Sequence, residues 1–132
     1  MTEGTIGALA LAPGLATGEV LVLAEPLSFW GGLDPETGTL IDAHHPQVGA
    51  SLTAAVLVMR SGRGSSSSSY VLAEAIRAGT APAGIVLGEP DDIIVIGALV
   101  ASELYGITVP VVVGSATTLG AIRNGEEIKL PP

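Results

Sequence analysis

The stretch that decides the fold is Gly62-Arg63-Gly64-Ser65-Ser66-Ser67-Ser68-Ser69-Tyr70, which contains five consecutive serines. The apolar run before it, residues 54–59, predicts a buried strand. The residues after it, 70–77, have the apolar spacing of a helix. A serine run is also typical of a flexible linker. Between a strand and a helix it can instead hold an anion or place a hydroxyl, because a helix N-terminus exposes unpaired N–H groups.

The composition bounds the size and the partners of the protein. The 132 residues show no composition break, which predicts a single domain over residues 1–132. Hydrophobic residues make up 48% and aromatic residues 3%, so the core must consist of Val, Ile, Leu and Ala. The net charge of −8 argues against nucleic acid and anionic membrane surfaces as partners. No apolar run approaches the roughly 18 residues of a membrane span, no secretion signal is recognisable, and we expect a cytoplasmic protein.

Metal and thiol chemistry have little support within this chain. Cysteine is absent, which excludes disulfides, thiol catalysis and iron–sulfur clusters held by this chain's own cysteines. The only histidines, His44 and His45, are adjacent, and on a strand they would point to opposite faces. We therefore predict no intrinsic metal site. One of the two histidines remains a candidate for facing a substrate or an interface.

The first part of the chain predicts mainly β structure. Residues 4–11 and 19–24 are apolar and are separated by the turn Ala12-Pro13-Gly14, so they predict an opening antiparallel pair. Residues 39–42 predict a further short strand.

The irregular loop at residues 26–38 contains the only Phe and the only Trp, Phe29 and Trp30. Two interpretations of these rings remain open. They either plug the end of a barrel or meet a ligand or a partner surface.

The remaining sequence alternates apolar runs with segments of helical spacing. The predicted elements are a helix to about residue 78, a strand at 83–88, a helix at 93–105, a strand at 109–114, a short helix at 115–123 and a strand at 126–130. Gly79 should end the first of these helices, and Asp91 or Asp92 should cap the second, whose first four residues are also compatible with a strand. This order predicts an α/β fold with a central sheet or partly closed barrel and flanking helices.

Ser65 and Ser66 carry the chemistry that the serine run could perform. At a helix start, their hydroxyl and N–H groups can bind a carboxylate or a phosphate. Arg60 and Arg63 add positive charge nearby, unless they are ordinary surface residues. A serine nucleophile needs a base or an oxyanion hole, but the sequence has neither a Gly-x-Ser-x-Gly elbow nor a Gly-x4-Gly-Lys-Ser/Thr phosphate loop. The run therefore predicts half of a site that something else completes.

Three segments together resemble the aconitase X small subunit, also called its swivel domain. They are residues 26–38 (PLSFWGGLDPETG), residues 41–46 (IDAHHP) and the run that begins at Gly62. The resemblance continues as far as residues 97–103 and covers nearly the whole chain. It implies the swivelling β/β/α fold. It also implies a hydro-lyase whose larger subunit or domain holds an iron–sulfur centre through its own cysteines, and this division of labour fits a chain without cysteine.

The resemblance also implies residue roles. Related aconitases have a Gly-x-Gly-Ser-Ser-Arg motif, whose first serine removes a proton from the α-carbon of the substrate while the metal assists loss of hydroxide. Aligned on this sequence, the motif makes Ser65 the catalytic base and Ser66 a substrate contact, with substrate binding by Gly62, Arg63 and Gly64. Ser67 stands where that motif has arginine. A carboxylate clamp must then come from Arg63, from backbone N–H groups or from the large subunit.

The family divides by substrate. Archaeal members are associated with mevalonate 5-phosphate dehydration and tend to have Gly-Ser-Thr-Val-Gly-Ser in the motif, whereas bacterial members with an unbroken serine run include cis-3-hydroxy-L-proline dehydratases. The five serines at residues 65–69 favour the hydroxyproline interpretation. Mevalonate 5-phosphate remains the alternative substrate.

A second resemblance belongs to another functional class. Residues 96–104 and 109–119 are similar to the phosphohistidine swivel domain of enzymes that use phosphoenolpyruvate. That family has its phosphate-accepting histidine seven residues before the glutamate that matches Glu103, and Ile96 occupies the position here. We interpret this similarity as a shared fold without phosphotransfer. A non-catalytic swivel or binding module remains a further alternative.

Overall fold

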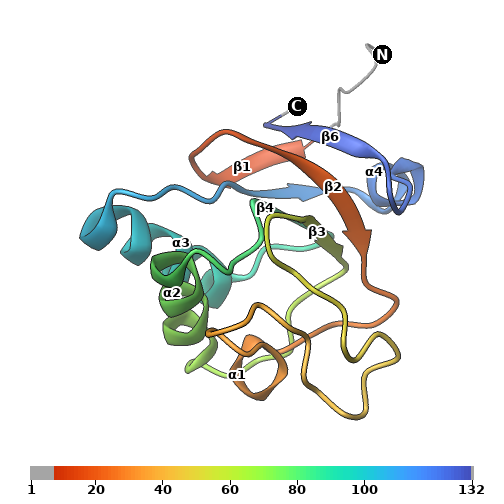
Figure 1. Ribbon diagram of the computed structural model, residues 1–132. Coiled ribbons are helices and arrows are strands. Elements are labelled where there is room, and N and C mark those ends of the chain that lie inside the picture. Colours follow the sequence, from red (N-terminus) through yellow and green to blue (C-terminus); the bar gives the residue numbers. More distant parts are fainter. Residues whose placement is uncertain (1–7, 132) are drawn as a thin grey trace.

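The computed structural model describes residues 8–131. They form one mixed six-stranded sheet of order β1-β5-β4-β3-β2-β6, which curls into a half-barrel (Figure 1). The strands are β1 (Ala8–Ala12), β2 (Ala16–Val22), β3 (Val56–Met59), β4 (Gly84–Leu87), β5 (Val111–Gly114) and β6 (Glu127–Leu130); the helices are α1 (Phe29–Gly32), α2 (Ser68–Ala78), α3 (Asp92–Tyr105) and α4 (Ala116–Ala121). The predicted α/β class with a partly closed barrel is confirmed.

The centre of the sheet is parallel, and this arrangement brings the strand-to-helix turns together. Strands β2, β3, β4 and β5 pair in parallel, and α2 and α3 make the crossovers from β3 to β4 and from β4 to β5. The two helices lie side by side on one face of the sheet (Figure 1). The turn from β3 into α2, which contains most of the serine run, therefore lies at the same sheet edge as the turn from β4 into α3.

Each face of the sheet has its own apolar core, as a sheet covered on both faces requires. Alternate residues of β3 show this directly: Leu57 and Met59 pack in the cluster under α2 and α3. Val56 and Val58 point into the curve of the sheet, toward Ile128 and Leu130 of β6. Both clusters consist almost entirely of aliphatic residues, as the scarcity of aromatic residues predicted.

The curl of the sheet comes from β2, which changes partners along its length. Its first part pairs antiparallel with β6, from Ala16 opposite Leu130 to Glu19 opposite Glu127. Its second part pairs in parallel with β3, from Val20 opposite Val56. Gly18 lies close to this change of partner, where an added Cβ would come within 2.6 Å of the Ala54 carbonyl oxygen. A residue with a side chain would therefore push the backbones apart.

The helix boundaries agree with the predicted signals. The left-handed Gly79 (φ 79°) ends α2, and the left-handed Gly106 (φ 68°) ends α3. The side chain of Asp91 caps α3 by accepting from the N–H groups of Ile93 and Ile94, so the whole segment is helical from Asp92 onward and the strand alternative for its start is wrong. Gly97 allows close helix packing, since its added Cβ would lie 2.9 Å from the Ser69 carbonyl oxygen of α2.

Two predictions about the first part of the chain are wrong. The two opening strands do not pair with each other, because β1 pairs antiparallel with β5 and β2 pairs with β3 and β6. The predicted start of the first strand, residues 4–7, lies outside the described residues. Residues 39–42 form no strand: Thr39 and Leu40 make only isolated bridges, to Ser51 and Leu33. A connection that turns this often has no room for a continuous ladder.

Candidate active site

The serine run begins as a turn and ends as a helix. Ser65 and Ser66 accept hydrogen bonds from the N–H groups of Ser68 (2.9 Å) and Ser69 (3.3 Å), and α2 starts at Ser68. Upstream, Gly62 bridges to Leu27, and the N–H of Arg63 donates to the Leu27 carbonyl at 3.2 Å. The run is therefore fixed in place, and the linker interpretation is wrong.

The last two serines of the run hold the structure together. The hydroxyl of Ser69 donates to the Ile93 carbonyl at 2.6 Å and so joins α2 to the start of α3. Ser68 is 4% exposed, and its oxygen accepts from the Trp30 N–H at 3.0 Å and lies 3.1 Å from the Ser28 hydroxyl. Neither hydroxyl is free for chemistry.

The side chains of the first three serines have no hydrogen-bond partner among residues 8–131. Ser65 is partly exposed, Ser66 and Ser67 are exposed, and none of their hydroxyls hydrogen-bonds to any part of the chain that the structure describes. Their N–H groups also find no acceptor among residues 8–131. Unpaired donors at the start of an 11-residue helix favour an anion. No base is hydrogen-bonded to Ser65 within these residues, so the arrangement is not a serine–histidine pair.

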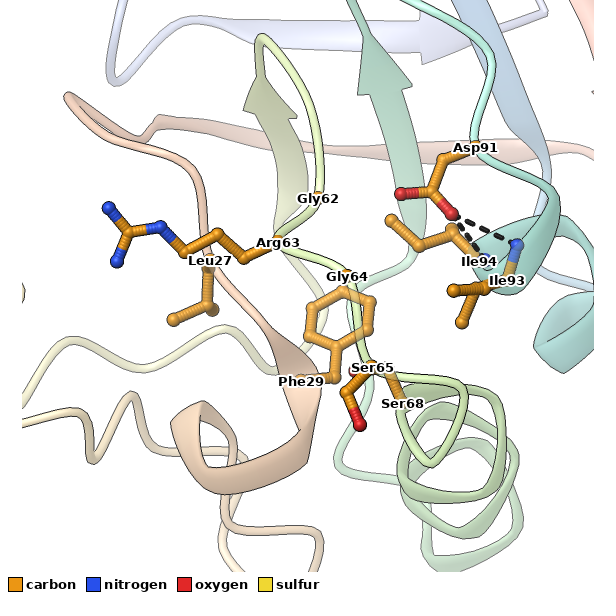
Figure 2. Close-up of a pocket in the computed structure, with 10 residues that line it drawn as sticks. All are labelled: Leu27, Phe29, Gly62, Arg63, Gly64, Ser65, Ser68, Asp91, Ile93 and Ile94. Carbon is orange, nitrogen blue, oxygen red and sulfur yellow. Dashed lines mark hydrogen bonds between the residues drawn. The ribbon is translucent and has the colours of Figure 1, made fainter.

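A shallow hollow lies beside Ser65, at the edge where β3 and β4 end (Figure 2). Leu27, Phe29, Ile93 and Ile94 supply its apolar lining, and Gly62 to Ser65, Ser68 and Asp91 complete it. Its volume is about 10 Å³, which is room for about one water molecule. The hollow itself is therefore too small for a ligand larger than water, and a larger ligand would have to lie above the serine turn.

The two glycines of the run differ. An added Cβ at Gly62 would come within 2.5 Å of Asp91 Oδ2, so any other residue there would displace the side chain that caps α3. An added Cβ at Gly64 meets nothing within 4 Å, and Gly64 has no left-handed φ. Nothing in the described chain needs glycine at that position, and the open space lies directly before Ser65.

The predicted positive charge is only partly beside the serines. Arg63 is exposed, and its side chain extends away from Ser65 (Figure 2). Arg60 lines a different hollow, of about 440 Å³, between the ends of β2 and β3 and helix α4. Neither arginine has an ion-pair partner within residues 8–131. By contrast, Arg77 binds Glu74 on α2 and lowers the pKa of that carboxyl.

The structure separates the two rings of the predicted aromatic loop. Phe29 is 1% exposed and belongs to the core, whereas Trp30 is 59% exposed. The left-handed Gly31 (φ 79°) follows Trp30 and reverses the chain. Each of the two interpretations from the sequence thus fits one ring: Phe29 fills the interior, and Trp30 is available to a ligand or partner.

Neither histidine lines the hollow. His45 lies in a turn, 4% exposed, with Nε2 at 3.0 Å from the Glu25 carbonyl and Nδ1 accepting from the Gln47 N–H. His44 is exposed. Within residues 8–131 no three His, Asp or Glu side chains gather as metal ligands.

No helix within residues 8–131 is long and apolar enough to cross a membrane.

Sequence reasoning missed Ser28 and Ser68 as a connected pair. Forty residues separate them, and within the run Ser68 is chemically identical to its neighbours. The one available signal was that Ser28 precedes the aromatic pair. A local pattern cannot reveal which of five serines the loop will meet.

The half-barrel with two crossover helices on one face, and an unfinished site at the carboxyl ends of its strands, defines a swivelling β/β/α domain. Comparison with known proteins identifies which one, because the aconitase X swivel domain family matches residues 5–132. The chain belongs to the aconitase X swivel domain family. It is also similar to the crystal structure of Thermococcus kodakaraensis aconitase X in its holo-form, with a TM-score of 0.84 and 33% identity over 95% of this chain and 89% of that one.

The curated relatives are dehydratases of two kinds. The chain is 48% identical over 101 residues to a cis-3-hydroxy-L-proline dehydratase of Pseudomonas aeruginosa, covering 76% of this chain and 17% of the relative. It is 36% identical over 118 residues to the phosphomevalonate dehydratase small subunit of Pyrococcus abyssi, covering 89% of this chain and 85% of the relative. The chain therefore spans less than a fifth of the first relative and most of the second. The predicted resemblance to hydro-lyase subunits is confirmed.

Proposed function

We propose that this chain is the swivel part of an aconitase X-type dehydratase, in which Ser65 is the catalytic base and the substrate is cis-3-hydroxy-L-proline. The observation that carries the proposal is the division of the serine run. Ser68 and Ser69 are held by neighbouring segments, whereas the Ser65 hydroxyl and the N–H groups of Ser65, Ser66 and Ser67 have no hydrogen-bond partner among residues 8–131. This arrangement supplies an available hydroxyl beside donors that can bind a carboxylate, and the hydroxyl still has to be activated.

The reaction removes a proton from the α-carbon and hydroxide from the neighbouring carbon, forming a double bond and water. The Ser65 hydroxyl gives up its proton, which ends on the departing hydroxide as water, and the resulting Ser65 alkoxide takes the α-proton and so becomes a hydroxyl again. The N–H groups of Ser65, Ser66 and Ser67 hold the substrate carboxylate at the start of α2. Arg63, Gly62 and Gly64 shape the surroundings of that carboxylate. Because Gly64 leaves open space before Ser65, a substrate can approach the backbone closely there.

The exposed turn is too weak to activate a serine alone. A helix N-terminus at the surface stabilises a negative charge by about 0.3–1 kcal/mol, whereas one pKa unit corresponds to about 1.4 kcal/mol. Donors in a dry, enclosed site contribute on the order of 3 kcal/mol each. The small hollow beside Ser65 offers no such enclosure. A larger aconitase X chain or domain must therefore cover the turn before Ser65 can act.

An iron–sulfur centre does not fit the residues of this chain. The chain has no cysteine, and residues 8–131 contain no group of three His, Asp or Glu side chains that could replace thiolates. We assign the centre to the larger chain. The role of the swivel part is then confined to proton transfer and substrate binding.

Mevalonate 5-phosphate is the second candidate substrate. A specific observation favours it: the chain is 53% identical over 79 residues to the phosphomevalonate dehydratase small subunit of Methanopyrus kandleri, covering 60% of this chain and 58% of the relative. The first candidate rests on the unbroken serine run and on the similarity to the Pseudomonas enzyme. A phosphate group at the serine turn would need a positive partner, and Arg63, which has no ion-pair partner within residues 8–131, could turn toward it.

The decisive experiment is co-expression with the large aconitase X chain of the same genome, followed by anaerobic assay of both substrates. We expect dehydration of cis-3-hydroxy-L-proline by the complex and none by either chain alone. Turnover of mevalonate 5-phosphate in its place would select the second candidate. Turnover by the isolated swivel chain would overturn the proposed dependence on a partner, and inactivity of the complex toward both substrates would overturn the proposed substrate class.

A further inference from the structure

Trp30 is a large apolar side chain that stays exposed because the backbone at Trp30 and Gly31 departs from helical geometry. It is the only Trp of the chain and is 59% exposed, whereas its neighbour Phe29 is 1% exposed. Its backbone is not helical (φ −70°, ψ 118°), and the left-handed Gly31 follows. These angles send one ring into the core and leave the other at the surface.

A closed ring of hydrogen bonds fixes the Trp30 backbone at both ends. The Ser28 hydroxyl donates to the Trp30 carbonyl at 3.0 Å, and the Trp30 N–H donates to Ser68 Oγ at 3.0 Å. The Ser68 hydroxyl then points its proton at Ser28 Oγ, 3.1 Å away. Every donor in the ring has an acceptor. Ser68 is 4% exposed, so solvent cannot easily replace these bonds.

Ser68 ties this loop to the serine turn. Its side chain holds Trp30, and its N–H donates to the Ser65 carbonyl at 2.9 Å. Ile41, 48% exposed, is held to the same loop, because its N–H donates to the Gly32 carbonyl at 2.8 Å. We call Trp30 and Ile41 the Trp30 edge. Phe29, the neighbour of Trp30, lines the same hollow as Ser65, so the loop that holds Trp30 borders the serine turn.

We propose that the Trp30 edge is the docking surface for the larger aconitase X chain, with Trp30 as its anchor. The inference rests on the proposed function for the identity of the partner. Two of the relatives are much longer than this chain, which covers 17% and 18% of the dehydratases of Pseudomonas aeruginosa and Hypocrea jecorina, so most of each enzyme lies outside the part that this chain matches. Ser68 bonds to both Ser65 and Trp30, so a body that encloses the serine turn comes close to the Trp30 edge.

The physical reason is preorganisation. Trp is enriched among the residues that dominate binding energy, especially where it enters a desolvated pocket. Ordering a flexible side chain and loop costs binding energy, and the Ser28–Ser68 ring has already ordered this loop. Ser68 bonds to both Trp30 and Ser65, so a partner positioned at Trp30 is also positioned relative to Ser65.

A second exposed apolar surface supplies the control. Helix α3 exposes Leu104 (66%) near its C-terminus. Leu104 lies 11 residues beyond Ile93, where Ser69 joins α3 to the serine run. At about 1.5 Å per residue this separation is roughly 16 Å. Leu104 is as apolar and as exposed as Trp30 but is remote from Ser65.

The test measures the Kd of the purified chain for the large aconitase X chain of the same genome. We expect Trp30→Ala to raise Kd at least about 30-fold and Ser68→Ala to raise it about 3- to 10-fold. Leu104→Ala should change it less than about twofold. A Kd within twofold of wild type for Trp30→Ala, or an equal loss for Leu104→Ala, overturns the proposal. An unchanged Kd for Ser68→Ala overturns the role of the hydrogen-bonded ring.

A measurement without mutation protects the test from misfolded variants. The single Trp gives one ¹⁹F signal after 5-fluorotryptophan labelling. That signal should shift on addition of the unlabelled large chain, and an unshifted signal in the formed complex refutes docking at Trp30. Ser65→Ala should bind normally. If the complex forms through Trp30 yet dehydrates neither substrate, the proposed function fails and the docking surface stands. If Trp30→Ala assembles with the large chain and turns over normally, the docking surface fails and the proposed function stands.

Discussion

The two halves of the serine run have the same side chains and opposite roles in the structure. Ser68 and Ser69 are bonded to segments 38 and 24 residues away in sequence, Trp30 and Ile93. Within residues 8–131, Ser65, Ser66 and Ser67 form hydrogen bonds only through their backbone carbonyls; Ser65 lines the shallow hollow, and Ser66 and Ser67 are exposed. The difference teaches that a low-complexity sequence can be divided by its surroundings into a scaffold and a site. The scaffold half fixes the position of the reactive half.

The largest expected difference between the two halves is catalytic. Ser65→Ala in the complex should lower kcat about 10²- to 10⁴-fold, because a positioned base contributes about that much. Ser67→Ala is the matched control, since the Ser67 side chain makes no cap hydrogen bond, and its kcat should stay within about twofold. Steady-state assay with cis-3-hydroxy-L-proline measures both variants. Equal losses for both serines would remove the special role of Ser65.

The glycines before the serines offer a second contrast, in stability. Gly62→Ala places a Cβ within 2.5 Å of Asp91 Oδ2, and the same carboxylate caps α3. Overpacking of this kind costs about 1–3 kcal/mol. The urea midpoint of unfolding should therefore fall for Gly62→Ala and not for Gly64→Ala. A Gly62→Ala variant as stable as wild type would mean that the Asp91 side chain moves without cost.

The scaffold half can be tested by removing one hydroxyl. Ser68→Ala leaves the Trp30 N–H without its acceptor and should lower the free energy of unfolding by about 1–2 kcal/mol. Ser66→Ala removes an exposed hydroxyl with no partner in residues 8–131 and should stay within about 0.5 kcal/mol. Urea unfolding of the isolated chain separates the two variants. Indistinguishable midpoints would show that the Ser68 hydrogen bonds are dispensable.

Local signals predicted the elements well where the cause is local. The apolar run before the serines became β3, Asp91 capped α3, and Gly79 ended α2, because each depends on residues within a few positions. The pairing of β1 was predicted wrongly because its partner, β5, is about a hundred residues away and has no local signature. The sequence could not predict which serines are held by other segments, for the same reason. Ser68 and Ser69 differ from the other three only because tertiary structure brings Trp30 and Ile93 next to them.

The smallest expected effect concerns Gly64, which borders the reactive half without serving the scaffold. Its added Cβ meets nothing within 4 Å, so Gly64→Ala should leave the free energy of unfolding within about 0.5 kcal/mol of wild type. In the complex the added methyl group occupies space through which a substrate carboxylate would approach the N–H groups of the turn. We expect kcat/KM to fall about fivefold, roughly 1 kcal/mol, with the Kd for the large chain unchanged. If the Kd for the large chain rises instead, the open space beside Gly64 belongs to the partner chain. If turnover is normal, the substrate lies farther from the backbone than proposed.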